Sequence, residues 1–143
     1  LSKGEPSMTT ANIKDLIPCD INKVWETLLA TEHYPAWRND VSRTDVIDEK
    51  HFTEYTKSGY STTYTVTVIE PYSRLELDME NDNAKGHWTL GCASKGSETE
   101  IDFTASVTAK QLSMRPVGKN VLEQKYLQKE QAQFITDLKK ALG

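Results

Sequence analysis

The longest uninterrupted pattern of apolar and polar positions lies between Lys119 and Leu142. One face recurs at spacings of three and four residues and consists of Leu127, Gln131, Phe134, Leu138 and Leu142. This spacing predicts a single α-helix, about 35 Å long at the usual helical rise. Pro116 and Gly118 before it, and Gly143 after it, are typical of helix boundaries.

Glutamines interrupt the N-terminal half of this helix face, whereas its C-terminal half is apolar. The interrupting residues are Gln124, Gln128 and Gln131. Such a helix suits a fold in which one end closes a core and the other end borders a cavity. Plain core packing with a more polar end is the alternative, and the helix alone does not separate the two.

Between residues 41 and 109 the pattern changes to strict alternation, which is typical of half-buried β-strands. The clearest case is 74–80, where Leu75, Leu77 and Met79 alternate with acidic residues. Together with 8–17 near the N-terminus, the expected strands are 41–47, 51–56, 61–69, 74–80, 86–93 and 98–109. In 61–69 we expect Tyr64, Val66 and Val68 to share a face. Short connections between the strands indicate an antiparallel meander.

Two short helical segments follow the first strand. Asp20 is a suitable N-cap for a helix that starts at Ile21, and the segment 31–40 is a second short helix or a tight loop. An alternating sheet needs a cover on its apolar face, and only the C-terminal helix is large enough. We therefore expect an α+β helix-grip arrangement, in which a curved antiparallel sheet of about seven strands wraps around that helix.

The strand alternation also predicts which residues face the helix. The inward set is Leu75, Leu77, Trp88, Leu90, Ile101 and Phe103. The outward set is Glu76, Asp78, Glu100 and Asp102. A slip of one residue in the register would exchange the two sets.

Length and composition describe one ordinary globular domain. The chain has 143 residues, of which 37% are hydrophobic and 27% charged. We expect a single domain over 8–143, with 1–7 as a flexible leader or a cloning remnant. The net charge of −4 argues against nucleic acid as a partner, and no apolar run has the length of a membrane span. Cys19 and Cys92, without a secretion signal, favour reduced thiols and a cytoplasmic location.

The order of several short motifs resembles a known superfamily. These motifs are 21–26 (Ile-Asn-Lys-Val-Trp-Glu), 34–37 (Tyr-Pro-Ala-Trp), Glu70-Pro71 with Arg74-Leu75, 86–88 (Gly-His-Trp), 98–101 (Glu-Thr-Glu-Ile) and the terminal helix. The chain is similar over 8–142 to the START-like (SRPBCC) helix-grip superfamily, which includes polyketide cyclase/dehydratase-like proteins, coenzyme-Q-binding proteins and pollen-allergen-type lipid carriers. The resemblance implies a hydrophobic cavity between sheet and helix. It implies no single chemistry, because this fold carries many functions.

No catalytic or metal-binding motif is apparent. His33, His51 and His87 are scattered, without a second His or Cys at ligand spacing, and no phosphate loop or nucleophile elbow is present. We therefore expect no metal, no cofactor and no assigned catalytic residue. Strand alternation places His87 on the face opposite Trp88, where a surface role is the simpler reading than a general base.

Several large side chains lie on the elements that this superfamily wraps around its cavity. The expected ligand-binding residues are Trp37, Tyr55, Tyr64, Trp88, Phe103, Gln131 and Phe134. Core filling is the alternative for each of them, but as a set they favour a cavity. Arg38 and Arg74 are possible polar anchors for a ligand carboxylate or phenolate, and pairing with nearby surface acids is their alternative role.

Two functions remain open. The first is binding or transport of a hydrophobic small molecule, such as a lipid, an isoprenoid or a polyketide. The second is a cyclase, dehydratase or aromatase that uses the same cavity, so the sequence leaves open whether the chain is an enzyme. A chaperone-associated module is a third and weaker alternative, which predicts an exposed apolar patch instead of a pocket. The ligand and the oligomeric state are not indicated.

Overall fold

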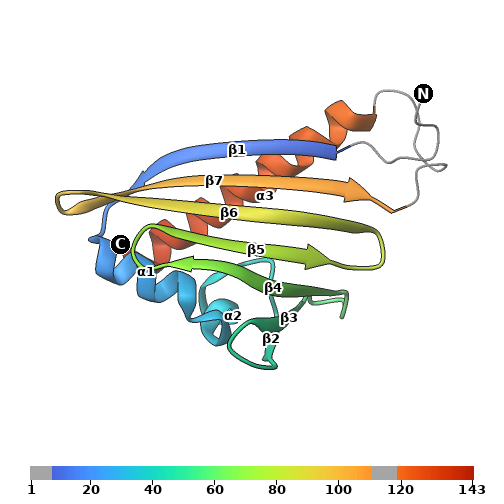
Figure 1. The fold of residues 1–143 in the computed structure, drawn as a ribbon, viewed down its shortest axis with the longest axis horizontal. Coiled ribbons are helices and arrows are strands. Elements are labelled where there is room, and N and C mark those ends of the chain that lie inside the picture. Colours follow the sequence, from blue (N-terminus) through green and yellow to red (C-terminus); the bar gives the residue numbers. More distant parts are fainter. Residues whose placement is uncertain (1–7, 111–118) are drawn as a thin grey trace.

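The computed structural model describes residues 8–110 and 119–143. The strands within these ranges are β1 (Met8–Ile17), β2 (Arg43–Val46), β3 (His51–Tyr55), β4 (Ser61–Glu70), β5 (Arg74–Glu80), β6 (Ala84–Lys95) and β7 (Glu98–Ala109). They form one curved sheet, and the long helix α3 (Lys119–Leu142) crosses behind it in the view of Figure 1. The leader expected at 1–7 and the helix boundaries expected at Pro116 and Gly118 lie outside the described residues.

The strand order in the sheet is β1-β7-β6-β5-β4-β3-β2, and every neighbouring pair is antiparallel. Strands β2 to β7 follow one another in sequence, so they form the expected meander. β1 is added at the far side, where it pairs with β7 from Met8–Thr108 to Ile17–Thr99. The predicted α+β helix-grip fold is confirmed.

The inner face of the sheet packs against α3 with the predicted register. The predicted inward residues that are at most 2% exposed are Leu75, Leu77, Leu90, Ile101 and Phe103. Phe134, Ile135 and Leu138 of α3 belong to the same core. Trp88 packs on this core but remains partly exposed, because it also borders the pocket described below.

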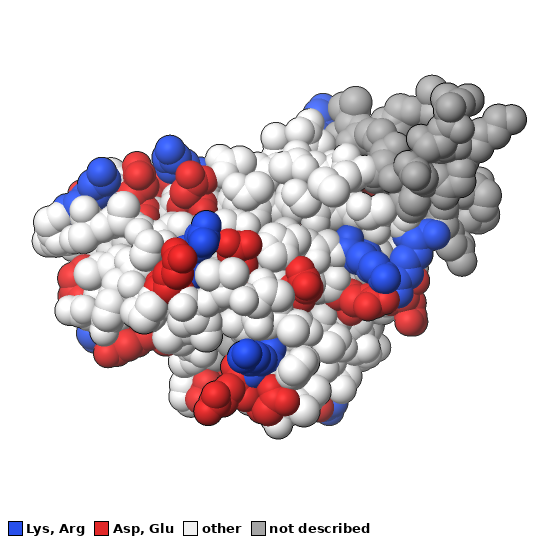
Figure 2. Space-filling model, in the orientation of Figure 1, with Lys and Arg blue, Asp and Glu red and all other residues white. Residues whose placement is uncertain are grey.

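The outer face of the sheet carries charged side chains in pairs. Nδ1 of His87 lies 2.6 Å from Asp78 Oδ1, and its Nε2 lies 2.7 Å from Glu76 Oε1. Figure 2 shows acidic and basic side chains intermixed over this face, without a large patch of one sign. The predicted outward acids Glu76, Asp78, Glu100 and Asp102 alternate with the buried residues of β5 and β7.

Two details of the strands differ from the sequence prediction. Val68 was expected on the same face as Val66, but a bulge between them adds one residue to β4. Val68 therefore pairs with Glu76 of the outer face, and that prediction is wrong because the bulge breaks the period of two. The strand expected at 41–47 is shorter, since Val41 is buried and its N–H donates to the carbonyl of Arg38.

Three short helical segments connect β1 to β2: α1 (Ile21–Leu29), η1 (Thr31–His33) and α2 (Tyr34–Trp37). The side chain of Asp20 accepts hydrogen bonds from the N–H groups of Asn22 and Lys23, so the predicted N-cap of α1 is confirmed. Arg38 and Asp40 follow directly after α2, and both lie at the space between the sheet and α3. No helix in the described ranges is long and apolar enough to cross a membrane.

Candidate ligand-binding pocket

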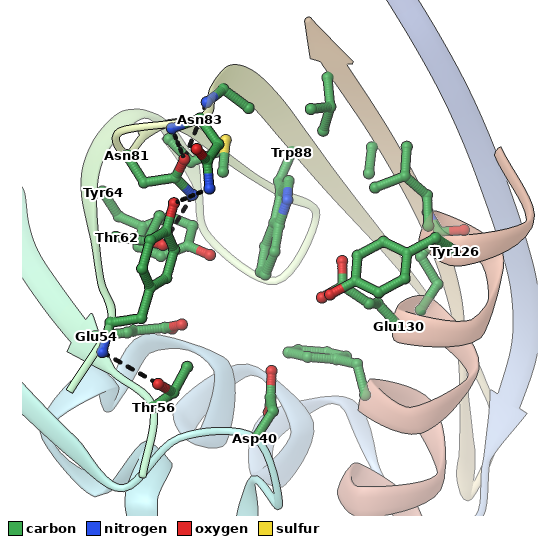
Figure 3. Close-up of a pocket in the computed structure, with 18 of the residues that line it drawn as sticks. Asp40, Glu54, Thr56, Thr62, Tyr64, Asn81, Asn83, Trp88, Tyr126 and Glu130 are labelled. Atoms are coloured by element: carbon green, nitrogen blue, oxygen red, sulfur yellow. Dashed lines mark hydrogen bonds between the residues drawn. The ribbon is translucent and has the colours of Figure 1, made fainter. Parts of the chain in front are cut away.

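A pocket of about 640 Å³ lies between the inner face of the sheet and the N-terminal half of α3. The residues that line it come from β1 (Thr9), the loop after α2, strands β3 to β7, and α3, which contributes six residues from Glu123 to Phe134. The labelled side chains surround one open space in Figure 3. The volume is in the range of small-molecule sites.

Aromatic rings form one wall of the pocket. The ring of Trp88 lies 5.1 Å from that of Tyr64 and 5.1 Å from that of Phe103, and both pairs meet edge to face. Phe134 of α3 completes the wall, at 5.3 Å from Phe103 and 6.1 Å from Trp88. Such edge-to-face contacts hold the rings in place and leave an apolar surface turned to the cavity.

A buried ion pair lies beside this wall. Nη1 of Arg38 donates to Glu54 Oε2 at 2.6 Å, and its Nη2 donates to Asp40 Oδ2 at 2.8 Å. The guanidinium also lies 5.8 Å from the centre of the Trp88 ring and 5.2 Å from that of Phe134. Glu54 reaches this position because it alternates inward with Phe52 on β3. Two of the three guanidinium nitrogens of Arg38 are therefore engaged before any ligand enters.

The ionisable groups of the pair are shifted by burial and by one another. Burial raises the pKa of Glu54, and the positive charge of Arg38 opposes that rise. Burial lowers the pKa of Arg38, but Glu54 and Asp40 outweigh it and raise the pKa overall, so Arg38 stays charged. Burial also raises the pKa of Tyr64 well above its usual value, so its phenol stays protonated and hydrogen-bonds to Glu54.

A second carboxylate reaches the pocket from α3. The hydroxyl of Tyr126 hydrogen-bonds to Glu130 one turn further along the helix. Glu130 keeps an exposed surface, yet partial desolvation of its carboxylate raises its pKa, and the negative charge of Asp40 raises it further. In Figure 3 Glu130 and Asp40 face each other across the open space.

Gln131 joins α3 to the sheet and borders the pocket. Its Nε2 donates to the carbonyl oxygens of Ala11 and Phe103, each at 3.0 Å. Only the nitrogen of the amide can donate to these carbonyls, which fixes the orientation of the side chain. Its Oε1 is consequently turned elsewhere and is buried without a hydrogen-bond partner among the described residues.

The opposite end of the pocket is polar but internally satisfied. Asn81 Nδ2 donates to Thr62 Oγ1 at 3.2 Å, and Asn83 Nδ2 donates to the hydroxyl of Tyr60 at 2.9 Å. These bonds are drawn in Figure 3. They position side chains from β4 and from the turn between β5 and β6.

The structure gathers most of the residues that were expected to contact a ligand. Those lining the pocket are Tyr55, Tyr64, Trp88, Phe103, Gln131, Phe134 and Arg38. Tyr55 only borders it, because its ring is stacked on Arg43, whose guanidinium lies 4.0 Å from the ring centre. Contact of these residues with a ligand stays a prediction.

Two expected residues do not line the pocket. Trp37 lies behind the wall, where its ring meets that of Phe134 at 5.4 Å, because the short helix α2 turns it toward α3. Arg74 lies on the outer face of β5, in ion pairs with Glu70 and Glu76. The alternation that turns Leu75 inward turns Arg74 outward.

The sequence analysis does not identify the carboxylates of the pocket, although part of the signal is present in the sequence. Glu54 shares the inward parity of Phe52 on β3, which marks it as an unusual buried acid. Tyr126 and Glu130 lie four residues apart on α3, and Phe134 follows four residues later, so the three share one helix face. Asp40 lies in an irregular loop, where no period indicates its direction.

Solved structures with the same fold include proteins of quite different description. A START superfamily protein from Mycobacterium smegmatis has a TM-score of 0.83 at 10% identity, covering 93% of this chain and 96% of its own. Zhui aromatase/cyclase from Streptomyces sp. R1128 has a TM-score of 0.74 at 10% identity, covering 95% and 94%. Norcoclaurine synthase from Thalictrum flavum has a TM-score of 0.70 at 9% identity, covering 96% and 87%. At these identities the likeness shows the fold alone.

No curated protein matches the chain in sequence. The family described as "Polyketide cyclase / dehydrase and lipid transport" matches residues 8–143, which is almost the whole chain. This match confirms the resemblance drawn from the ordered motifs. The chain belongs to the polyketide cyclase/dehydrase and lipid transport family.

Proposed function

We propose that the protein binds a small molecule with a large apolar surface in the pocket beneath α3. The observation that carries this proposal is the cavity of about 640 Å³ beside a continuous aromatic wall. Protein interiors are normally close-packed, so a space of this size is not a packing defect. Trp88 stays partly exposed although it packs against the core, which suits a surface that a ligand covers.

Burial of apolar ligand surface supplies the driving force, at about 25 cal/mol per Å² before the cost of association is subtracted. A neutral fluorescent probe such as N-phenylnaphthylamine should therefore bind in the low micromolar range and raise the melting temperature. Native mass spectrometry of protein from its own source tests the same proposal with the natural ligand.

Three variants separate pocket binding from surface adsorption. Phe134→Asp places a charge in the aromatic wall, and Val107→Trp fills the pocket with a ring while remaining apolar; both residues line it. Lys125→Ala changes an exposed position of the same helix. Probe binding should fall in the first two variants and persist in the third. Equal binding by all folded variants would remove the basis of the proposal.

A second candidate function is a reaction in the same pocket, of the cyclase or dehydratase type. The observation in its favour is the Glu54 carboxyl, which has a raised pKa and lies between the fixed charge of Arg38 and the Tyr64 hydroxyl. A carboxyl group of this kind can donate or accept a proton in the reaction. Incubation with a short poly-β-ketone probe should give loss of water by mass spectrometry, and Glu54→Gln should abolish that loss.

A further inference from the structure

The charged groups around the pocket are strongly unbalanced. The carboxylates of Asp40, Glu54 and Glu130 line it. Among the described lining residues the only lysine or arginine is Arg38. In Figure 3 the side chains of Asp40, Glu54 and Glu130 extend from three different elements toward the same open space.

Arg38 does not neutralise this group of acids. Its Nη1 and Nη2 are engaged by Glu54 and Asp40 at 2.6 and 2.8 Å, so one positive charge is shared between two negative ones. Glu130 stands on the other side of the cavity, and the charge of Asp40 acts on it as well as on Glu54. The carboxylates therefore repel one another across a space that holds room for a ligand.

Two buried polar atoms without a partner among the described residues give a second and independent indication. Gln131 is 2% exposed and lines the pocket, and its Oε1 has no protein hydrogen-bond partner. The amide nitrogen of this side chain is held by two carbonyls, so the free atom is an acceptor. Thr9 is 6% exposed, lines the same pocket, and has a buried hydroxyl without a protein partner. Buried polar atoms normally find partners. The Gln131 oxygen can only accept a hydrogen bond, whereas the Thr9 hydroxyl can accept or donate one.

The aromatic wall is compatible with a cation. The guanidinium of Arg38 lies 5.8 Å from the centre of the Trp88 ring and 5.2 Å from that of Phe134, so these rings already contact one positive charge. A ligand carboxylate, in contrast, would meet three acids and find an arginine whose terminal nitrogens are occupied. The excess of carboxylates and the unpartnered acceptor of Gln131 favour a cationic donor, whereas the buried Nε of Arg38 is a donor without a partner among the described residues.

We propose that the ligand of this pocket is an amine with an apolar body, whose ammonium group lies between Asp40 and Glu130 while the body packs on Trp88 and Phe134. The proposal rests on the proposed binding function and specifies its ligand class. It reverses the expectation from sequence that Arg38 anchors a ligand carboxylate.

Three probes with one ring system test it: naphthylmethylamine, naphthylmethanol and naphthoate. Their affinities are measured near neutral pH by displacement of N-phenylnaphthylamine. The amine should bind about tenfold more tightly than the alcohol, and the carboxylate more weakly than either. The preference should shrink as salt is added, because screening weakens the partly exposed charges.

Variants assign the preference to the pocket. Asp40→Asn and Glu130→Gln should each weaken amine binding by about three- to tenfold and leave alcohol binding unchanged. Glu49→Gln removes the same charge at an exposed residue outside the lining, and it should change neither. An equal effect of all three substitutions would attribute the preference to net charge and overturn the proposal.

The outcomes distinguish the two proposals. If the alcohol displaces the probe and the amine has no advantage, or if the carboxylate binds most tightly, the amine proposal is wrong and the binding function stands. If the neutral probe itself does not bind in the pocket, the binding function is wrong, and the amine proposal fails with it.

Discussion

Arg38 and Glu54 form an ion pair at 2.6 Å with only 3% and 9% of their side-chain surfaces exposed. The pair joins the end of α2 to β3. A buried charge is tolerated because its partner is present. Each residue therefore depends on the other for its own burial.

Removal of one partner should be costly. Arg38→Met leaves the Glu54 carboxyl buried without its cation, and the free energy of unfolding should fall by about 3–5 kcal/mol. Urea unfolding monitored by tryptophan fluorescence measures the change. Arg74→Met, at an exposed pair with Glu70, is the matched control and should cost less than about 1 kcal/mol. Equal losses would show that burial of the Arg38 pair carries no special cost.

The amide of Gln131 should matter for stability as well as for the pocket. Gln131→Leu removes two hydrogen bonds to Ala11 and Phe103, and the free energy of unfolding should fall by about 1–3 kcal/mol. Gln128→Leu, at an exposed position one turn earlier, should change it by less than about 0.5 kcal/mol. Denaturant titration of both variants checks the difference, and a neutral Gln131→Leu would contradict it.

Stability should depend on pH through His87. Partial burial lowers the pKa of His87, but its hydrogen bonds to Asp78 and Glu76 outweigh burial and raise the pKa overall. The folded protein then binds the proton more tightly than the unfolded chain. The resulting stability is fully present below about pH 6.5 and is lost as the pH rises through the folded pKa.

His87→Gln should accordingly lower the unfolding free energy more at acidic than at alkaline pH. The difference should stay below about 1 kcal/mol, because 38% of the side chain is exposed and solvent screens the interaction. Thermal unfolding across the neutral range measures it. In a background carrying Glu76→Gln and Asp78→Asn, the pH-dependent part of the His87→Gln effect should vanish. If it persisted, the pH dependence would belong to another titratable group.

The two cysteines should be free thiols. Both are unbonded in the structure, and burial raises the pKa of Cys92 to about 11. Titration under denaturing, non-reducing conditions should find two thiols per chain. In a Cys19→Ser variant the remaining thiol should react slowly in the native protein at about pH 8, since little thiolate is present there. No titratable thiol, or an immediate native reaction, would contradict this.

Much of the fold follows from the periodic spacing of apolar and polar residues in the sequence. Leu75, Leu77 and Met79 alternate with acids without a break, so the bounds and the register of β5 could be predicted from that run. Val68 could not, because the bulge before it depends on how β4 pairs with β5, and no single residue marks it.

The pocket was only partly predictable, for a related reason. Trp88 and Phe103 lie on regular strands, so their direction followed from parity. Trp37 lies on a helix of four residues. This segment is too short for the helical period or the strand period to predict where a side chain points. Asp40 is brought to the cavity by its bond with Arg38, a contact that exists only after the chain has folded.

The pairing of β1 with β7 has a consequence for how the protein is made. β1 is the earliest strand of the sheet to be synthesised, and its neighbours in space, β7 and α3, are the latest elements. The amide of Gln124 and the amine of Lys139 also reach back to β1, at Thr10 and Asp15. While a ribosome is still extending the chain, β1 has nothing to pair with, and the helix that covers the core is still absent. The domain can therefore complete its fold only after α3 has emerged, which leaves an apolar sheet face uncovered during most of its synthesis.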